Sequence, residues 1–121
     1  MATIKSYTDI EQSKKLSEIL PLESADMCYK CIEDDPYDIV CKPYSEWKEE
    51  YKGLLIRGDA NVIPCWSLAA LINVLPNENM LVKTTYGEYY CLAKDIMTKH
   101  YDNPIDACVK LILKLHELNL L

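Results

Sequence analysis

The sequence contains no phenylalanine, and its aromatic residues are nine tyrosines and two tryptophans. Both residue types carry a polar group on an apolar ring. They are favoured where the ring is covered and the polar group stays hydrated, at the edge of a core or on a contact surface. The absence of Phe therefore predicts aromatic residues at surfaces as well as in the interior.

Basic residues are scarce, and Arg57 is the only arginine. Thirteen Lys and Arg against nineteen Asp and Glu give a formal net charge of -6. A general DNA- or RNA-binding protein needs a basic surface that displaces counterions, and no run of Lys and Arg occurs here. The composition argues against general nucleic-acid binding and favours a partner with a basic groove.

Long apolar runs are also absent. No stretch approaches the roughly 20 apolar residues that span a bilayer, and Met1 to Lys15 lacks the apolar segment of a secretory signal. We therefore expect a cytoplasmic protein without membrane contact. In that compartment the six cysteines are expected to be reduced thiols.

The length and hydrophobicity indicate one core. At 121 residues, half of them hydrophobic, the chain is long enough for one domain and too short for two. We predict a single α+β domain over residues 1–121. In it, N-terminal, central and C-terminal helices pack against a small antiparallel sheet.

Helix ends are marked by capping residues and prolines. Thr8 and Glu11 have the spacing of a capping box, which predicts a first helix that ends at Pro21. Asn103 as the N-cap, followed by Pro104, predicts the C-terminal helix.

The central helix is predicted within residues 61–76. Pro64 suits its start, Ser67 is a candidate cap, and Pro76 ends it. Its apolar residues occur nearly all round, which is typical of a buried helix. The charged segment 44–52 (YSEWKEEYK) is a further candidate helix, with Trp47 and Tyr51 on one face.

Two hairpins are predicted from apolar and β-branched runs that turn residues separate. The first joins strands at 27–32 and 37–41 through a turn at 34–36. The second joins 80–86 and 88–94 at Gly87, with 96–100 as a third strand.

Three blocks carry a resemblance to known sequences: YTDIEQSKKLSEILPLESADM (7–27), IPCWSLAALINVLP (63–76) and YDNPIDACVKLILKLHELNLL (101–121). They resemble an uncharacterised family of small proteins carried by prophages and mobile elements of gut Bacteroidetes. The family has no established activity and no assigned catalytic residues, so no site residue follows from it. The resemblance implies an accessory role, such as a regulator or inhibitor of host machinery, including defence systems.

Cys28-Tyr29-Lys30-Cys31 has the spacing of a metal or redox pair. A zinc site needs two more ligands; Cys41 could be a third, but no second such pair exists. On a strand, Cys28 and Cys31 point to opposite faces, which prevents joint ligation. We expect no metal and no cofactor, and the carboxylates of 33–38 are expected to be a solvated turn.

Cys65 raises the hypothesis of a cysteine hydrolase. A helix N-terminus stabilises a thiolate, and His100 could activate it. An orienting residue would have to come from Asp95, Asp102 or Asn103. The alternative is that Cys65 is a core residue beside Trp66. We expect no enzyme, and Cys65 is retained as a candidate reactive thiol.

The tyrosines of the second hairpin raise the hypothesis of a small-molecule or signalling-nucleotide binding protein. Tyr86, Tyr89 and Tyr90 could stack a base. Lysines 83, 94 and 99 and Arg57 could supply charge for phosphates. The alternative is that Tyr suits strands and packs on the helices.

The leading hypothesis is a non-enzymatic accessory protein that binds a host protein. It rests on the acidic composition, on the lack of a catalytic set, and on Tyr and Trp residues that anchor protein interfaces. The predicted contact residues are Trp66, Tyr86, Tyr89 and Tyr90. The C-terminal helix also suggests a homodimer, since leucines 113, 118, 120 and 121 lie off its main apolar stripe.

Overall fold

The computed structural model describes residues 5–32, 35–38 and 62–121. In chain order they form α1 (Ile10–Ser17), the 3₁₀ turn η1 (Leu22–Ser24), β1 (Met27–Ile32), β2 (Asp35–Asp38), β3 (Val62–Cys65), α3 (Leu68–Val74), β4 (Met80–Lys83), β5 (Tyr89–Ala93), β6 (Ile96–Met97) and α4 (Pro104–Glu117). The predicted α+β fold is confirmed. The predicted helix at 44–52 lies outside the described residues. So does the first part of the acidic turn at 33–38, whose last four residues are described only as strand β2.

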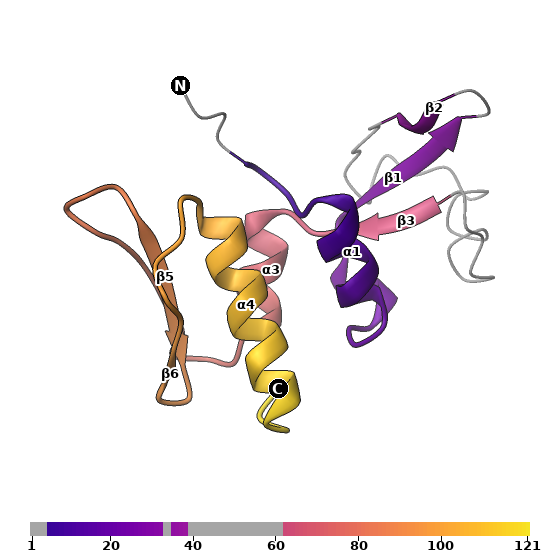
Figure 1. The fold of residues 1–121 in the computed structure, drawn as a ribbon. Helices are drawn as coiled ribbons and strands as arrows, with labels where there is room; N and C mark the ends of the chain where they lie inside the picture. Colours follow the sequence, from indigo (N-terminus) through magenta and orange to yellow (C-terminus); the bar gives the residue numbers. More distant parts are fainter. Residues whose placement is uncertain (1–4, 33–34, 39–61) are drawn as a thin grey trace.

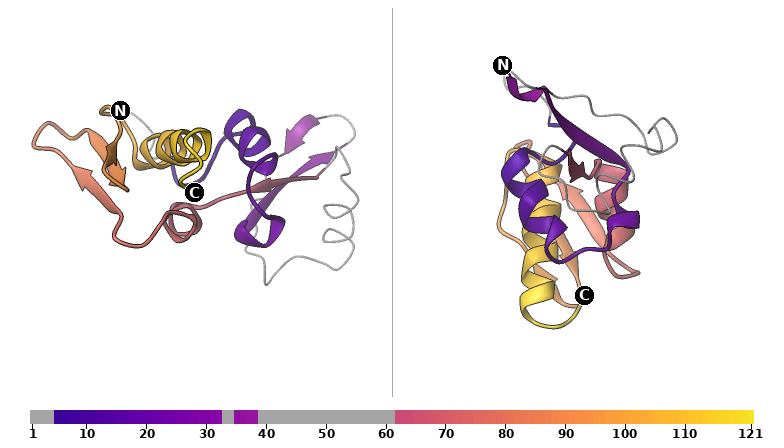
Figure 2. Two further views of the ribbon diagram at one scale, coloured as in Figure 1. Left: turned by 90° about the horizontal axis from the view of Figure 1, so that it is seen from below. Right: turned by 90° about the vertical axis from the view of Figure 1, so that its right-hand side faces the viewer.

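The strands form two antiparallel sheets, so the prediction of one sheet was wrong. The orders are β2-β1-β3 and β4-β5-β6. The sheets lie at opposite ends of the molecule, with the helices between them (Figures 1 and 2). The sequence gives no local signal for this division, because β1 pairs with β3 from a segment about thirty residues later.

Both edge strands of the first sheet contain a proline. Pro36 lies in β2 and Pro64 in β3, opposite Cys28 of β1. Proline has no N–H to give to a ladder, so it is tolerated at a sheet edge, where one side of the strand is unpaired. This explains two errors: the predicted turn at 34–36 is partly strand, and Pro64 belongs to a strand instead of a helix start. Residues 39–41, the end of the predicted second strand, lie outside the described part of the chain.

The helix after β3 begins later than predicted. Ser67 is its N-cap and accepts a hydrogen bond from the backbone N–H of Ala70 at 3.2 Å, as expected from the sequence. Asp26 fixes this cap, since its carboxylate accepts hydrogen bonds from both the N–H and the hydroxyl of Ser67. Cys65 therefore ends a strand and does not begin a helix.

The second hairpin is formed as predicted. Gly87 has φ +79° in the turn between β4 and β5, a conformation that suits glycine. The turn from β5 to β6 places Lys94 and Asp95 at positive φ, 52° and 63°, which matches the twist of a two-residue hairpin. The third strand is shorter than predicted, since β6 is Ile96–Met97.

The C-terminal helix also matches its prediction. Asn103 Oδ1 accepts a hydrogen bond from the N–H of Asp106 at 2.8 Å, and Pro104 is the first helical residue. One face of α4 is fully buried. It packs on β5 and β6 on one side and on α3 on the other, and so forms the centre of the main core.

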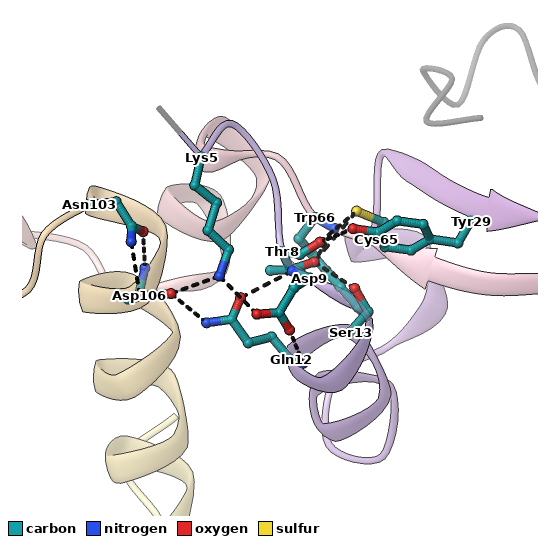
Figure 3. A network of polar contacts seen from close by, with 10 residues as sticks. All are labelled: Lys5, Thr8, Asp9, Gln12, Ser13, Tyr29, Cys65, Trp66, Asn103 and Asp106. Atoms are coloured by element: carbon teal, nitrogen blue, oxygen red, sulfur yellow. Dashed lines mark hydrogen bonds and ion pairs between the residues drawn. The ribbon is translucent and has the colours of Figure 1, made fainter. Parts of the chain in front are cut away.

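The first helix begins one residue later than predicted. Asp9, not Thr8, is the N-cap, and the capping box is completed by Gln12 instead of Glu11. Thr8 is instead fully buried. Its hydroxyl contacts Ser13 Oγ at 2.7 Å and accepts a hydrogen bond from the N–H of Trp66 at 3.1 Å (Figure 3).

The backbone of Thr8 joins the same network. Its N–H donates to the carbonyl of Trp66 at 2.9 Å, and its carbonyl accepts a hydrogen bond from the Tyr29 hydroxyl at 2.5 Å. Thr8 thus connects the start of α1 to β1 and to the segment after β3 (Figure 3). These contacts hold the first sheet against the helices.

A second polar cluster joins α1 to α4. The Asp106 carboxylate accepts hydrogen bonds from Lys5 at 2.9 Å, from Gln12 at 2.7 Å and from Asn103 at 2.8 Å (Figure 3). Burial opposes ionisation of Asp106, but these donors outweigh it and hold the pKa of its carboxyl below the usual value. The ionised carboxylate is therefore the stable partner of Lys5.

Candidate interaction surface

One face of the β4-β5-β6 sheet carries apolar side chains that do not pack into the main core. The pairing places Met80, Leu92 and Met97 opposite one another in a row across the three strands. Val82 and Tyr90 form the next row on the same face, because side chains alternate along a strand. We call these five residues the outer face.

The opposite face of the sheet packs against α4. Cys91 and Ala93 are fully buried, and Leu81, Tyr89 and Ile96 pack against the main core. No outer-face residue belongs to that core. Met80 is 55% exposed and Met97 is 65% exposed. In Figure 1 the sheet therefore has α4 on one side and no labelled element on the other.

Two aromatic side chains extend this apolar surface. Tyr90 stacks on the His100 ring, with 5.2 Å between the ring centroids and 17° between the planes. Tyr86, in the turn between β4 and β5, is 89% exposed. Large rings at the surface supply contact area at a low cost in side-chain entropy, so they suit a contact with another protein.

The segment that forms this surface has no net charge. Residues 80–102 contain three lysines (83, 94 and 99) and three acidic residues (Glu88, Asp95 and Asp102). By contrast, residues 33–61 contain eight acidic and four basic residues, which account for four of the six excess negative charges. The acidic surface that the composition predicts thus rests mainly on residues 33–61, of which the structure describes only 35–38.

The three hairpin tyrosines do not form one stacking platform. Tyr89 and Tyr90 are consecutive on β5, so their rings lie on opposite faces, and Tyr89 packs against the core. Lys83 lies over the Tyr89 ring, 5.9 Å from its centroid, and not beside Tyr90. Arg57 lies outside the described residues. The geometry does not assemble the predicted nucleotide site, and of the three tyrosines only Tyr86 and Tyr90 lie on or beside the outer face.

Trp66 is not available for a partner. Its side chain is 0% exposed, and its indole N–H donates to Ser24 Oγ at 3.0 Å. The sequence prediction of a contact role for Trp66 was therefore wrong. Its ring fills the main core beside α3, and its polar atom is bound within the protein.

Cys65 lies in a buried polar network. It is fully buried, its thiol donates to the carbonyl of Thr8 at 3.4 Å, and the Thr8 hydroxyl approaches the sulfur at 3.5 Å. His100 stacks on Tyr90 of β5. Cys65 ends β3, which lies on the other side of the helices from β5 (Figure 1). The structure does not bring together the thiol and imidazole of the hydrolase hypothesis, and Cys65 has no helix N-terminus to favour its thiolate.

Three further thiols are buried as well. Cys28, Cys91 and Cys108 are core residues without disulfides. Cys91 of β5 and Cys108 of α4 face each other, and the hydrogen bond to Cys91 together with burial raises the pKa of the Cys108 thiol. Cys108 thus stays protonated. Within residues 5–32, 35–38 and 62–121, no group of three or more His, Cys, Asp or Glu side chains could hold a metal ion.

A groove of about 510 Å³ opens elsewhere, between the segment after α1, α3 and the end of α4. Its wall includes His116 and Leu121, and a second hollow of about 380 Å³ continues it over Ser24 and Asn73. Leu118, Leu120 and Leu121 are each more than 40% exposed, whereas Leu113 packs against the core. The exposed leucines of the predicted dimer contact are thus confined to the last turn and the end of the chain.

Sequence reasoning missed Met80, Val82, Leu92 and Met97 as surface residues. Two of them belong to the run Met80-Leu81-Val82, which is apolar at every position. Such a run is typical of a strand covered on both faces, and it hides the alternation that would mark an open face. Which face of this sheet stays open depends on where α4 packs, and the sequence has no local sign of that.

Comparison with known proteins gives no relative: no protein-family model, no curated protein and no solved structure matches the chain. Among the described residues, none of the helices has the length and apolar character needed to cross a membrane.

Proposed function

We propose that the chain is a non-enzymatic accessory protein that acts by binding a host protein through the outer face of the β4-β5-β6 sheet. The single observation that supports this most strongly is the exposure of Met80 and Met97 in one apolar row with Leu92. Contiguous apolar surface on a small protein is typical of an interaction site.

The chemistry of the outer face fits a protein partner better than a polar ligand. Methionine side chains are flexible and polarisable, so they adapt to the shape of an apolar partner surface. Tyr90 and Tyr86 add rings of the kind that anchor protein interfaces. Residues 80–102, which form this sheet, also contain lysines and carboxylates in equal number, and polar residues of this kind form the rim of such contacts.

The biological setting follows from the resemblance of the three sequence blocks to small proteins of prophages and mobile elements. In that setting we place the protein in the host cytoplasm, as a regulator or inhibitor of host machinery such as a defence system. The acidic segment 33–61 would add electrostatic attraction toward a basic partner and increase the rate of association.

The test compares two double variants in capture from a host lysate. In the first, Met80→Lys and Met97→Lys place charges in the exposed row. Both positions are more than half exposed, so the fold should persist. We expect the wild-type chain to capture a specific host protein and this variant to bind the purified partner at least about 100-fold more weakly, since unpaired charges would be buried in the contact.

The matched control is Leu118→Lys with Leu121→Lys, which adds the same charge at exposed apolar positions away from the sheet. It should bind as the wild type does. Equal binding by the sheet variant and the wild type, measured by titration calorimetry with the purified partner, would exclude the outer face as the contact. Loss of binding in the control alone would move the contact to the C-terminal turn.

A further inference from the structure

The exposed edge of β4 differs from the other sheet edges. β2 and β3, the edges of the first sheet, each contain a proline. β6 is only two residues long, and Tyr101 pairs with Tyr89 beyond it. β4 has the sequence Met-Leu-Val-Lys, without proline, and its one charge is at its end. Proteins usually protect sheet edges with proline, charge or a bulge, and β4 lacks such protection over three of its four residues.

The hydrogen-bond pattern shows which backbone groups of β4 face outward. The N–H of Thr84 donates to the carbonyl of Glu88 at 2.7 Å, so this pair is hydrogen-bonded. In an antiparallel ladder such pairs alternate, and those of Val82 and Met80 with β5 continue the series. The N–H and C=O groups of Leu81 and Lys83 therefore point away from β5, and β4 is the edge of its sheet within the described residues.

We propose that a second copy of this chain pairs with this edge, β4 against β4, about a two-fold axis at Val82. In an antiparallel arrangement Leu81 of each copy then lies opposite Lys83 of the other. Both are residues whose backbone groups face outward, so they form two hydrogen-bonded pairs. The result is one six-stranded antiparallel sheet, with the two Val82 side chains adjacent at its centre.

Two features favour a second copy over another protein strand. The register is self-complementary, because the outward-facing residues Leu81 and Lys83 lie symmetrically about Val82. Residues 80–102 also carry no net charge, so two copies meet here without the repulsion that their overall charge of -6 would cause elsewhere. Pairing uses the edge of the sheet and joins the two outer faces into one surface, so it goes beyond the proposed binding of a host protein and does not depend on it.

The first test is the mass in solution. Four backbone hydrogen bonds and a short apolar row make a small interface. We therefore expect a dissociation constant of the dimer on the order of 100 µM. Lys83→Pro removes an outward N–H without removing one used in pairing with β5, while Lys83→Ala removes the same side chain and keeps the N–H. By sedimentation equilibrium, we expect dimers for the wild type and Lys83→Ala, and monomers for Lys83→Pro.

A second test does not depend on the folding of the proline variant. The two Val82 residues would form a non-hydrogen-bonded pair, with Cα atoms about 4.5 Å apart, within reach of a disulfide. In a background with Cys31→Ser and Cys41→Ser, Val82→Cys should form an intermolecular disulfide with oxidised glutathione. The more exposed Met97→Cys, two strands away, serves as the control and should cross-link at least about tenfold more slowly.

Three results would overturn the proposal. One is a wild-type chain that stays monomeric at millimolar concentration. Another is a folded Lys83→Pro variant that dimerises as the wild type does. The third is equal cross-linking of Val82→Cys and Met97→Cys. Loss of the dimer in the variant with Leu118→Lys and Leu121→Lys, with Lys83→Pro unaffected, would instead assign the contact to the C-terminal helix.

Discussion

Replacing Trp66 with alanine is expected to lower the free energy of unfolding by about 3 to 5 kcal/mol, the cost of emptying a large buried site. The ring is fully buried in the main core, where α3 and α4 pack together. Since small domains are stable by only about 5 to 15 kcal/mol, the variant should lose a large part of its stability. Urea denaturation followed by circular dichroism measures the loss.

Trp66→Phe is the matched control for this change. It keeps most of the apolar volume and removes the indole N–H that donates to Ser24. We expect a loss of about 1 to 2 kcal/mol, since the ring is smaller and the hydrogen bond is lost. Suppose that Trp66→Ala had the same midpoint of urea unfolding as the wild type but no longer bound a partner. Trp66 would then be a contact residue, and its assignment to the core would be wrong.

Thr8→Val is expected to cost about 2 to 4 kcal/mol, although the two side chains have nearly the same shape. The valine would leave the N–H of Trp66 and the hydroxyl of Ser13 without the Thr8 oxygen. Ser13 is fully buried, and Trp66 lies in the core. Removing one partner of a buried donor costs about 1 to 3 kcal/mol for each group left unpaired.

Thr8→Ser separates the hydroxyl from the methyl group. It keeps the hydrogen bonds and should cost about 1 kcal/mol for the lost methyl. In a double-mutant cycle, Ser13→Ala should restore part of the stability lost in Thr8→Val, because it removes the unpaired hydroxyl. A Thr8→Val chain within about 0.5 kcal/mol of the wild type, measured by thermal and urea unfolding, would show that this network does not hold the first sheet in place.

The elements with local signals could be predicted from the sequence. Asn103 followed by Pro104 specifies a helix start within a few residues, and the structure has it there. Gly87 marks the hairpin in the same way, because its positive φ is costly for other residues. In both segments the local preference and the tertiary contacts agree.

Predictions failed where a residue serves a distant contact. Thr8 has the chemistry of a helix cap, but it is used to bond Trp66 and Ser13, and the adjacent Asp9 caps the helix. Pro64 has the sequence features of a helix start, but it lies in the edge strand β3, which pairs with β1. The division into two sheets likewise depends on pairing across segment 33–61, for which the sequence has no local sign.

The candidate surface was only partly predictable. Tyr86 and Tyr90 were identified from the sequence and lie on or beside the outer face, whereas Tyr89 and Trp66 pack inward. Residue type predicts that a tyrosine suits an interface, but not which side of a strand faces the core. That choice depends on where α4 packs, which only the tertiary structure determines.

The most direct test of the outer face is the oxidation of its methionines by hydrogen peroxide, read by mass spectrometry at low protein concentration. Met80 and Met97 are exposed in the free chain, while Met27 packs beside the small core of the other sheet and serves as the internal reference. In the complex with a captured host protein, we predict that Met80 and Met97 oxidise at least about fivefold more slowly, with Met27 unchanged. Oxidation of Met80 and Met97 at the free rate within a formed complex would contradict binding through this sheet.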